Sequence, residues 1–440
     1  MKLPRSILAG ISAPALPIAG LGLPIVVYLP NFFANTVGIP LALVGVIFML
    51  ARFWDVFTDV IFGIVADRTR PPLGRRRFWI LLSMPILMVS VWLIFNPPDG
   101  VGVFWLSLWL GILYVGWTMA TISVISWSAE LSNDYDERTR VQAWYMGSLM
   151  IGLIAVLVIP ALIEQIGGGD DRAKMQGIAL FIIILLPLCF GFAVWKVPEP
   201  KVHEDTSEEW TKVLKSMWRS KPLLLILGCD LMIGLASGIA GSLYLFVAVD
   251  ALGLGKGASL LLLFYFLVGC FAVPLWAWAA SRLEKHRALA GASVYAGLTA
   301  LLFLAVPAGS MIFMLIVTVL NGVTYASARF LLKAMMADVT DADRMESGRM
   351  QAGVYFSLLT LTEKIGLALA VGIPFVILPA LGFEPRGEKT AEGIQALVLI
   401  FALAPAILHL SAAFILWRFP LGRLRQQELR EKLNEKFGTS

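Results

Sequence analysis

Twelve long apolar stretches constrain this 440-residue chain more than any other feature of its sequence. A bilayer core about 30 Å thick is crossed by roughly 20 apolar residues in a helix. The stretches predict twelve membrane spans at residues 8–33, 41–66, 78–97, 101–131, 142–165, 175–196, 222–251, 258–281, 288–308, 310–337, 351–381 and 394–418. We therefore expect an all-α membrane protein with twelve transmembrane helices.

The composition favours the same class of protein. Hydrophobic residues make up 58% of the chain and charged residues 15%, whereas a soluble domain has about 45–50% and about 25%. The surface is therefore expected to contact membrane lipids. The first apolar stretch runs past Val27, which is too long for the core of a cleavable signal peptide. Three cysteines and three histidines, all scattered, indicate neither a disulfide framework nor a metal cluster.

A single long polar stretch divides the spans into two sets of six. We predict an N-terminal six-helix bundle at 1–196, a cytoplasmic linker at 197–221, a C-terminal six-helix bundle at 222–420 and a cytoplasmic tail at 421–440.

Lysine and arginine residues are distributed unequally between the two sides of these spans. Loops and termini on one side hold 26 of them, and loops on the other side hold 5. The positive-inside rule then places both termini in the cytoplasm, and we expect a multi-pass protein of a bacterial-type inner (plasma) membrane. Topology thus accounts for the net charge of +5. The sequence does not favour a nucleic-acid partner, because no basic face is interleaved with aromatic residues.

Ionisable residues lie within the second span. Arg52, Asp55 and Asp59 are spaced three and four apart, which puts them on one stripe of a helix, and Thr58 adds a hydroxyl beside it. Two carboxylates and a hydroxyl are hard oxygen ligands that suit Na⁺ at Asp55 and Asp59. The same carboxylates can instead share a proton. A simpler interpretation is that Asp55 only neutralises Arg52.

Other buried charges lie in the second half of the chain. Lys364 in the eleventh span can compete with a cation for the acidic pair, and we include it in the cation site. Asp230 and Arg329 are candidate substrate ligands, with Lys333 four residues after Arg329. The alternative for each is a charge partner across the bundle.

A glycine- and arginine-rich motif ends the second span. An acid at a helix end that faces arginines can latch one side of a transporter in one state. The motif predicts such a conformational latch, made of Gly63, Asp67, Arg68, Gly74, Arg75 and Arg76. Its alternative is a basic turn that binds lipid headgroups.

Three ordered motifs carry a resemblance to a known family. The segment ARFWDVFTDVIFGIVADRTRPPLGRRRFWI resembles a helix-two signature of the glycoside–pentoside–hexuronide:cation symporters, which include the melibiose carrier. SNDYDERTRVQAW and MMADVTDADRMESGRMQAGVYFS are similar to the next two cytoplasmic signatures. The resemblance implies the major facilitator fold and symport with Na⁺, Li⁺ or H⁺. It also implies cation-binding roles for Asp55, Asp59 and Lys364.

The sequence departs from the melibiose carrier at the sugar site. Trp127 matches a tryptophan that stacks on the sugar, but Ser123 and Tyr145 replace an aspartate and an arginine. The first span, with Ile18 and Ala19 in place of charged residues, is nearly free of polar side chains. We therefore expect a small organic solute that is not a simple galactoside, and hypothesise an amphipathic or anionic compound.

The sequence thus predicts a monomeric, cation-coupled symporter that works by alternating access, with no cofactor beyond the coupling ion. A proton-driven exporter or uncoupled facilitator on the same fold is the alternative. A non-transporting membrane receptor or scaffold is the second. No nucleophile–base pair or phosphate-binding loop indicates an enzyme.

Overall fold

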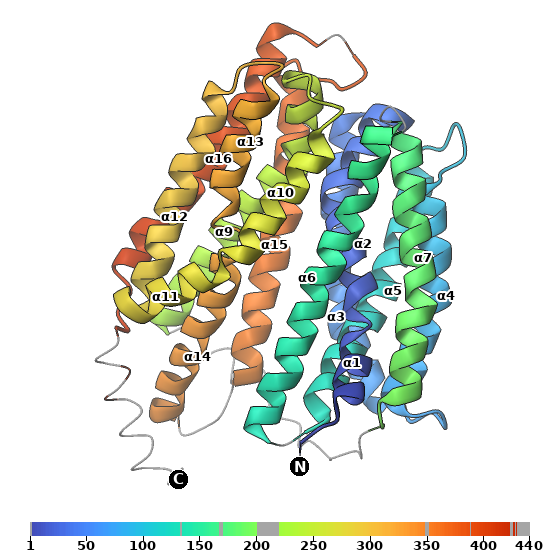
Figure 1. Cartoon of the computed structure of the whole chain (residues 1–440), viewed down its shortest axis with the longest axis vertical. Helices are drawn as coiled ribbons and strands as arrows, with labels where there is room; N and C mark the ends of the chain where they lie inside the picture. Colours follow the sequence, from blue (N-terminus) through green and yellow to red (C-terminus); the bar gives the residue numbers. More distant parts are fainter. Residues whose placement is uncertain are drawn as a thin grey trace. The chain divides into compact units, whose positions relative to one another are not determined.

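The computed structural model describes residues 2–132, 134–166, 170–199, 220–347, 352–387 and 389–422, together with residues 426 and 428. Within these residues, twelve helical segments are long and apolar enough to cross a membrane, which confirms the predicted class (Figure 1). They run over Arg5–Val37, Leu41–Ala66, Arg75–Phe95, Val103–Glu130, Glu137–Ile166, Asp171–Lys196, Lys221–Ala251, Ala258–Leu283, Lys285–Ala305, Met311–Met345, Gly353–Ala380 and Ala391–Trp417.

The chain folds into two compact units. Unit 1 holds Met1–Glu204, Gly241–Leu263 and Val371–Leu397, and unit 2 holds Asp205–Ala240, Phe264–Ala370 and Val398–Ser440. Four spans of the second half thus contribute one end to unit 1, so the units do not follow the order of the chain. Most of the predicted linker and tail lies outside the described residues.

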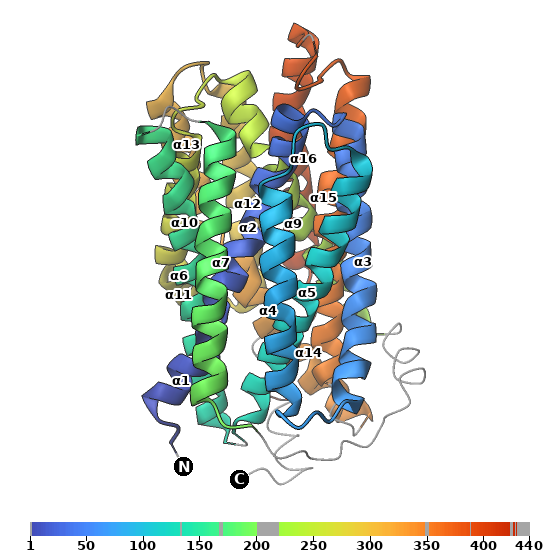
Figure 2. The ribbon, with the colours of Figure 1, turned by 90° about the vertical axis from the view of Figure 1, so that its right-hand side faces the viewer.

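Unit 1 contains the first six spans. Its helices are α1 (Arg5–Ser12), α2 (Ala15–Asn31), α3 (Leu41–Arg68), α4 (Arg75–Phe95), α5 (Val103–Glu130), α6 (Tyr135–Ile166) and α7 (Asp171–Lys196). The helix α4 packs against α5 and α7, and α3 packs against α5 (Figure 2). Phe62, Ala66 and Met119 form a small core between α3 and α5. This packing places the acidic stripe of α3 against α5.

Unit 2 contains most of the remaining spans. Its helices are drawn from α9 (Lys221–Leu245), α10 (Ala258–Phe271), α11 (Val273–Leu283), α12 (Lys285–Leu301), α13 (Met311–Gly322), α14 (Ser327–Ser347), α15 (Ala352–Ala380) and α16 (Ala391–Trp417). One large hydrophobic core joins α9, α12, α14 and α15.

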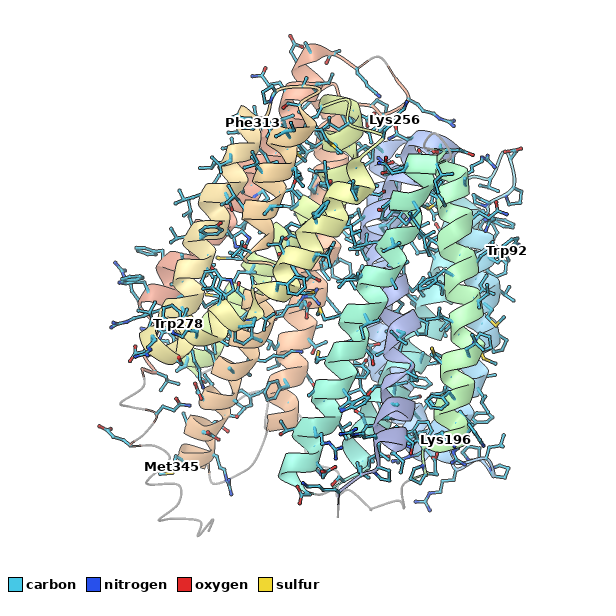
Figure 3. The ribbon with its side chains drawn as sticks, in the orientation of Figure 1. Trp92, Lys196, Lys256, Trp278, Phe313 and Met345 are labelled. Atoms are coloured by element: carbon cyan, nitrogen blue, oxygen red, sulfur yellow. The ribbon has the colours of Figure 1, made fainter. Side chains whose placement is uncertain are left out.

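In both units, apolar side chains also lie on the outer faces of helices. Trp92 of α4 and Trp278 of α11 point outward (Figure 3), as expected for helices that contact lipid.

Several spans are interrupted, and each interruption has a local cause. Span one breaks at Ala13–Pro14, because proline lacks a backbone donor. Spans one and seven both end in π-helical turns, at Phe32–Val37 and Phe246–Ala251. Span eight changes direction at Ala272, between α10 and α11 (Figure 1). Span ten is broken between Gly322 and Ser327. Both spans were predicted as apolar stretches, and hydropathy does not indicate either interruption.

Candidate cation and substrate site

The acidic stripe of α3 is directed into unit 1. Asp55 is fully buried, Thr58 is 9% exposed and Asp59 is partly buried. The structure therefore brings together three of the residues predicted for the cation site.

Thr118 of α5 joins the two carboxylates. Its hydroxyl oxygen lies 3.1 Å from Asp55 Oδ1 and 2.8 Å from Asp59 Oδ1. It also lies 3.3 Å from the hydroxyl of Thr58, which donates to the backbone carbonyl of Asp55 at 3.0 Å. Two carboxylates and two hydroxyls from α3 and α5 thus form one compact oxygen cluster.

The cluster has more acceptors than its hydroxyls can serve. Thr58 and Thr118 each carry one hydroxyl proton, whereas the contacts around them number four. Carboxylate oxygens in such a cluster can also accept a small cation or a proton. Among the described residues no group of three or more His, Cys, Asp or Glu side chains is placed to hold a metal ion. The mixed carboxylate and hydroxyl set instead fits a hard cation such as Na⁺ or Li⁺.

Arg52 lies at the edge of this cluster. Its Nη1 is 3.9 Å from Asp55 Oδ2, and its guanidinium stacks 5.2 Å from the ring centroid of Tyr114. The distance is long for a charge-assisted hydrogen bond, which is usually about 2.7–2.9 Å. Arg52 therefore reduces the local negative charge from the edge of the cluster.

The remaining predicted charges lie in unit 2. Asp230 on α9 is 8% exposed and accepts a 2.6 Å hydrogen bond from Thr362 on α15. Arg329 on α14 lies 3.5 Å from Glu363 of α15, with its side chain 58% exposed. Lys364 follows Glu363 on α15, and its pairing with the acids of unit 1 stays a prediction.

The predicted substrate residues of unit 1 are enclosed. Trp127 is fully buried, and its indole N–H donates to the Pro198 carbonyl at 3.0 Å. Ser123 is also fully buried, and its hydroxyl has no hydrogen-bond partner among the described residues. Tyr145 is 6% exposed. Their contact with a solute stays a prediction.

Residues of the predicted latch form a tight ionic cluster within unit 1. Arg75 and Arg76, at the start of α4, both contact Glu130 at the end of α5, at 2.7 and 2.5 Å. The backbone N–H of Arg76 also donates to Glu199, which follows α7, at 2.7 Å. These bonds join the ends of three helices.

The other latch residues have different surroundings. Gly74 has a φ of +99°, and a Cβ there would lie 2.6 Å from the Glu199 carboxyl carbon. Gly63 has no neighbour within 4 Å of such an atom. Arg68 is exposed in the last turn of α3, and the side chain of Asp67 lies outside the described set.

Sequence reasoning missed Thr118, Glu130 and Glu199 as partners. Glu130 and Glu199 stand at the predicted inner ends of spans four and six, so their topological position gave a usable signal. Thr118 is one of several hydroxyl residues in the apolar helix α5, and a threonine hydroxyl inside a helix commonly bonds to the backbone of the same helix. Nothing in the local pattern of α5 marks it as a ligand.

Comparison with known proteins identifies the family of the chain. A family described as MFS/sugar transport protein matches residues 10–423. The inner membrane symporter YicJ of Escherichia coli is 24% identical over 413 residues, which cover 90% of this chain and 87% of that protein. The human sodium-dependent lysophosphatidylcholine symporter 1 is 22% identical over 435 residues, covering 88% and 78%.

Two further comparisons bear on class and fold. The isoprimeverose transporter of Lactiplantibacillus pentosus is 24% identical over 403 residues, covering 86% of this chain and 81% of that protein. The solved structure of the nucleoside transporter NupG has a TM-score of 0.68 at 15% identity, covering 93% of this chain and 98% of that one. Since the relatives are transporters, the prediction that the chain is not an enzyme is confirmed. The chain belongs to the MFS/sugar transport family of the major facilitator fold, is similar to its glycoside:cation symporters, and is a multi-pass membrane transporter of small molecules.

Proposed function

We propose that this transporter moves a small organic solute together with Na⁺, by alternating access. The observation that carries the proposal is the oxygen cluster, in which one hydroxyl of Thr118 lies within 3.1 Å of both Asp55 and Asp59. Thr58 completes the set of hard ligands. Since relatives include a sodium-dependent symporter, we favour Na⁺ over Li⁺ and H⁺.

Residues of both units take part in this transport. Asp55, Asp59, Thr58 and Thr118 hold the cation, and Lys364 competes with it for the carboxylates. The solute contacts Arg329 and Asp230, along with Trp127, Tyr145 and Ser123 once unit 1 rearranges. Charged groups within spans cost at least about 2.5 kcal/mol each on insertion scales, which supports a functional reason for their presence. We place the working monomer in an inner membrane with both termini in the cytoplasm.

The test is a calorimetric Na⁺ titration of the purified protein at two pH values. We expect saturable binding that Asp55→Asn and Asp59→Asn abolish. Asp99→Asn serves as the matched control, because Asp99 has a side chain 91% exposed and pairs with Arg172, remote from the cluster. Binding that survives in both variants would remove the site assignment.

The same titration separates coupling by sodium from coupling by protons. Two carboxylates that contact one hydroxyl can also retain a proton, and this favours a proton-driven carrier as the second candidate. Suppose that Na⁺ does not bind at either pH, and that the wild type takes up a proton on acidification but Asp59→Asn does not. Proton coupling then replaces sodium coupling as the proposed function.

A further inference from the structure

The exposed face of α14 carries an arginine in an unusual place. Arg329 lies near the middle of the span Met311–Met345, yet its side chain is 58% exposed. Lys333, one turn further, is exposed on the same face. The opposite face of α14 is packed into the core of unit 2 through Leu331, Leu332, Met335, Met336 and Val339. Charged groups at such a depth usually face a water-accessible interior rather than lipid.

Arg329 uses little of its bonding capacity. A guanidinium has five N–H donors, but Arg329 makes a single 3.5 Å ion pair with Glu363 and a cation–π contact with Tyr325. No other hydrogen bond or ion pair of Arg329 occurs within the part of the chain that the structure describes. Most of its donors are therefore available to a ligand.

The pair with Glu363 is loose compared with the structural ion pairs of this protein. Arg75–Glu130 and Lys285–Asp338 both close to 2.7 Å, as expected for charge-assisted hydrogen bonds. The Glu363 side chain is 38% exposed, and an exposed pair of this kind contributes little, about 0–1 kcal/mol. Another oxyanion can therefore replace Glu363 at small cost.

Packed aromatic rings lie beside the guanidinium of Arg329. Tyr325 lies in the break between α13 and α14, and its ring packs edge-on against Tyr265 and Phe266 of α10, at 5.6 and 4.6 Å. Two glycines allow this approach: a Cβ on Gly322 would lie 2.6 Å from the Tyr265 carbonyl oxygen, and one on Gly269 would lie 2.8 Å from the Tyr325 Cβ. Tyr265 and Tyr325 are both partly exposed, so an apolar surface lies beside the guanidinium.

We propose that Arg329 binds the single anionic group, a carboxylate or a phosphate, of an otherwise apolar solute, and that this group takes the place of Glu363. The apolar body of the solute packs on Tyr325 and Tyr265. The inference rests on the proposed transport function and specifies the chemistry of its solute. It makes Arg329 the residue that sets selectivity for charge.

Matched probes test this assignment on the full-length purified protein. We would measure the affinities of 4-butylbenzoate, 4-butylphenyl phosphate and 4-butylbenzamide by calorimetry. The benzoate and the benzamide have nearly the same shape and differ in charge. We expect at least one anion to bind about tenfold more tightly than the amide, because it gains charge-assisted bonds. The better of the two anions identifies the group as carboxylate or phosphate.

Two variants and a control test whether the preference for an anion over the amide depends on Arg329. Arg329→Gln should abolish the difference between anion and amide, and Glu363→Gln should tighten anion binding about threefold by removing the competing carboxylate. Arg287→Gln is the matched control, because Arg287 has a side chain 61% exposed and lies 3.5 Å from Glu284. It should leave all affinities unchanged. Thermal unfolding of Arg329→Gln in detergent, compared with that of the wild type, verifies that the variant is folded.

The outcomes are distinct from those of the sodium titration. If no anion binds better than the amide, including the case in which none binds, or if the preference survives in Arg329→Gln, the anion assignment is overturned while Na⁺ binding can stand. If the preference depends on Arg329 but Na⁺ does not bind, the anion assignment holds and sodium coupling fails.

Discussion

At the scale of single residues, Thr118 decides whether the acids of α3 act as one site. Its hydroxyl bridges Asp55 and Asp59, at 3.1 and 2.8 Å. Removing it would leave two carboxylates with a missing oxygen ligand between them, while the helix α5 keeps its packing.

We predict that Thr118→Val weakens Na⁺ binding about tenfold, since a hydrogen bond to a charged group contributes about 1.5 kcal/mol. Thr118→Ser should restore most of the affinity. Thr121→Val is the matched control, because the Thr121 hydroxyl bonds to the carbonyl of Trp117 within its own helix, at 2.8 Å. Calorimetry measures all three variants, and equal affinity in Thr118→Val and the wild type would contradict the ligand role.

Two glycines of the latch motif are expected to respond in opposite ways to alanine. Gly74→Ala forces a side chain into a left-handed backbone with φ of +99° and against Glu199, and should destabilise the protein by about 1–2 kcal/mol. Gly63→Ala adds a methyl group in open space within α3, and should stabilise it by roughly 0.5–1 kcal/mol. Thermal unfolding in detergent compares the two, and similar shifts would refute the strain at Gly74.

At the scale of helices, the sequence predicts the spans well and their interruptions poorly. Length and apolarity located all twelve segments because lipid imposes both. Proline is an uncertain guide to these breaks, because span one is interrupted at Pro14 while Pro24 lies inside α2. The break in span ten has no proline, and it depends on close packing of Gly322 against Tyr265, which hydropathy does not record. The cluster around Asp55 was predictable from α3 alone only in part, because its fourth side chain, Thr118, comes from α5.

The ends of several unit 1 helices meet in a buried polar network opposite the predicted cytoplasmic side. Glu164 of α6 is 3% exposed. It accepts hydrogen bonds from the backbone N–H and the hydroxyl of Ser259, at 3.0 and 2.6 Å, and it pairs with Lys174 of α7 at 3.2 Å. Tyr28 of α2 donates to the same Ser259 hydroxyl at 2.9 Å. The network therefore fastens the first turn of α10 to three helices.

We predict that Glu164→Gln destabilises the protein by about 3 kcal/mol, because it leaves Lys174 buried with a weaker set of partners. Asp171→Asn removes the other carboxylate that contacts Lys174, at 2.9 Å, but that side chain is 42% exposed, so its effect should stay below about 1 kcal/mol. Thermal unfolding followed by loss of helical signal provides the measurement. A larger effect for Asp171→Asn would show that Glu164 is not the centre of the network.

The ionic cluster at the other end of unit 1 holds helix ends rather than a core. We expect Glu130→Gln to speed amide hydrogen exchange at the start of α4 and the end of α5, since Arg75 and Arg76 lose the carboxylate they share. Exchange in the middle of both helices should stay unchanged. Uniform acceleration along α4 would mean that the cluster stabilises the whole unit and does not act as a local latch.

At the scale of the whole molecule, the chain repeats its plan after the central linker. Spans one and seven, the first of each set of six, both end in π-helical turns, which agrees with the internal repeats of the major facilitator fold. The charged residues are not repeated: the oxygen cluster lies in unit 1, and the exposed Arg329 lies in unit 2. Symport requires that binding at the first site changes the second.

Hydrogen exchange can measure that coupling without knowledge of the solute. We predict that saturating Na⁺ slows exchange in α3 and α5 of unit 1, where the ligands are ordered, and also changes exchange in α14 and α15 of unit 2. A ligand can shift a conformational equilibrium only by its differential affinity for the two states, so Asp59→Asn should remove both responses together. Asp99→Asn should keep both. A sodium response confined to α3 and α5 would show that the cation binds without biasing unit 2, and the protein would then be a facilitator with a cation site rather than a symporter.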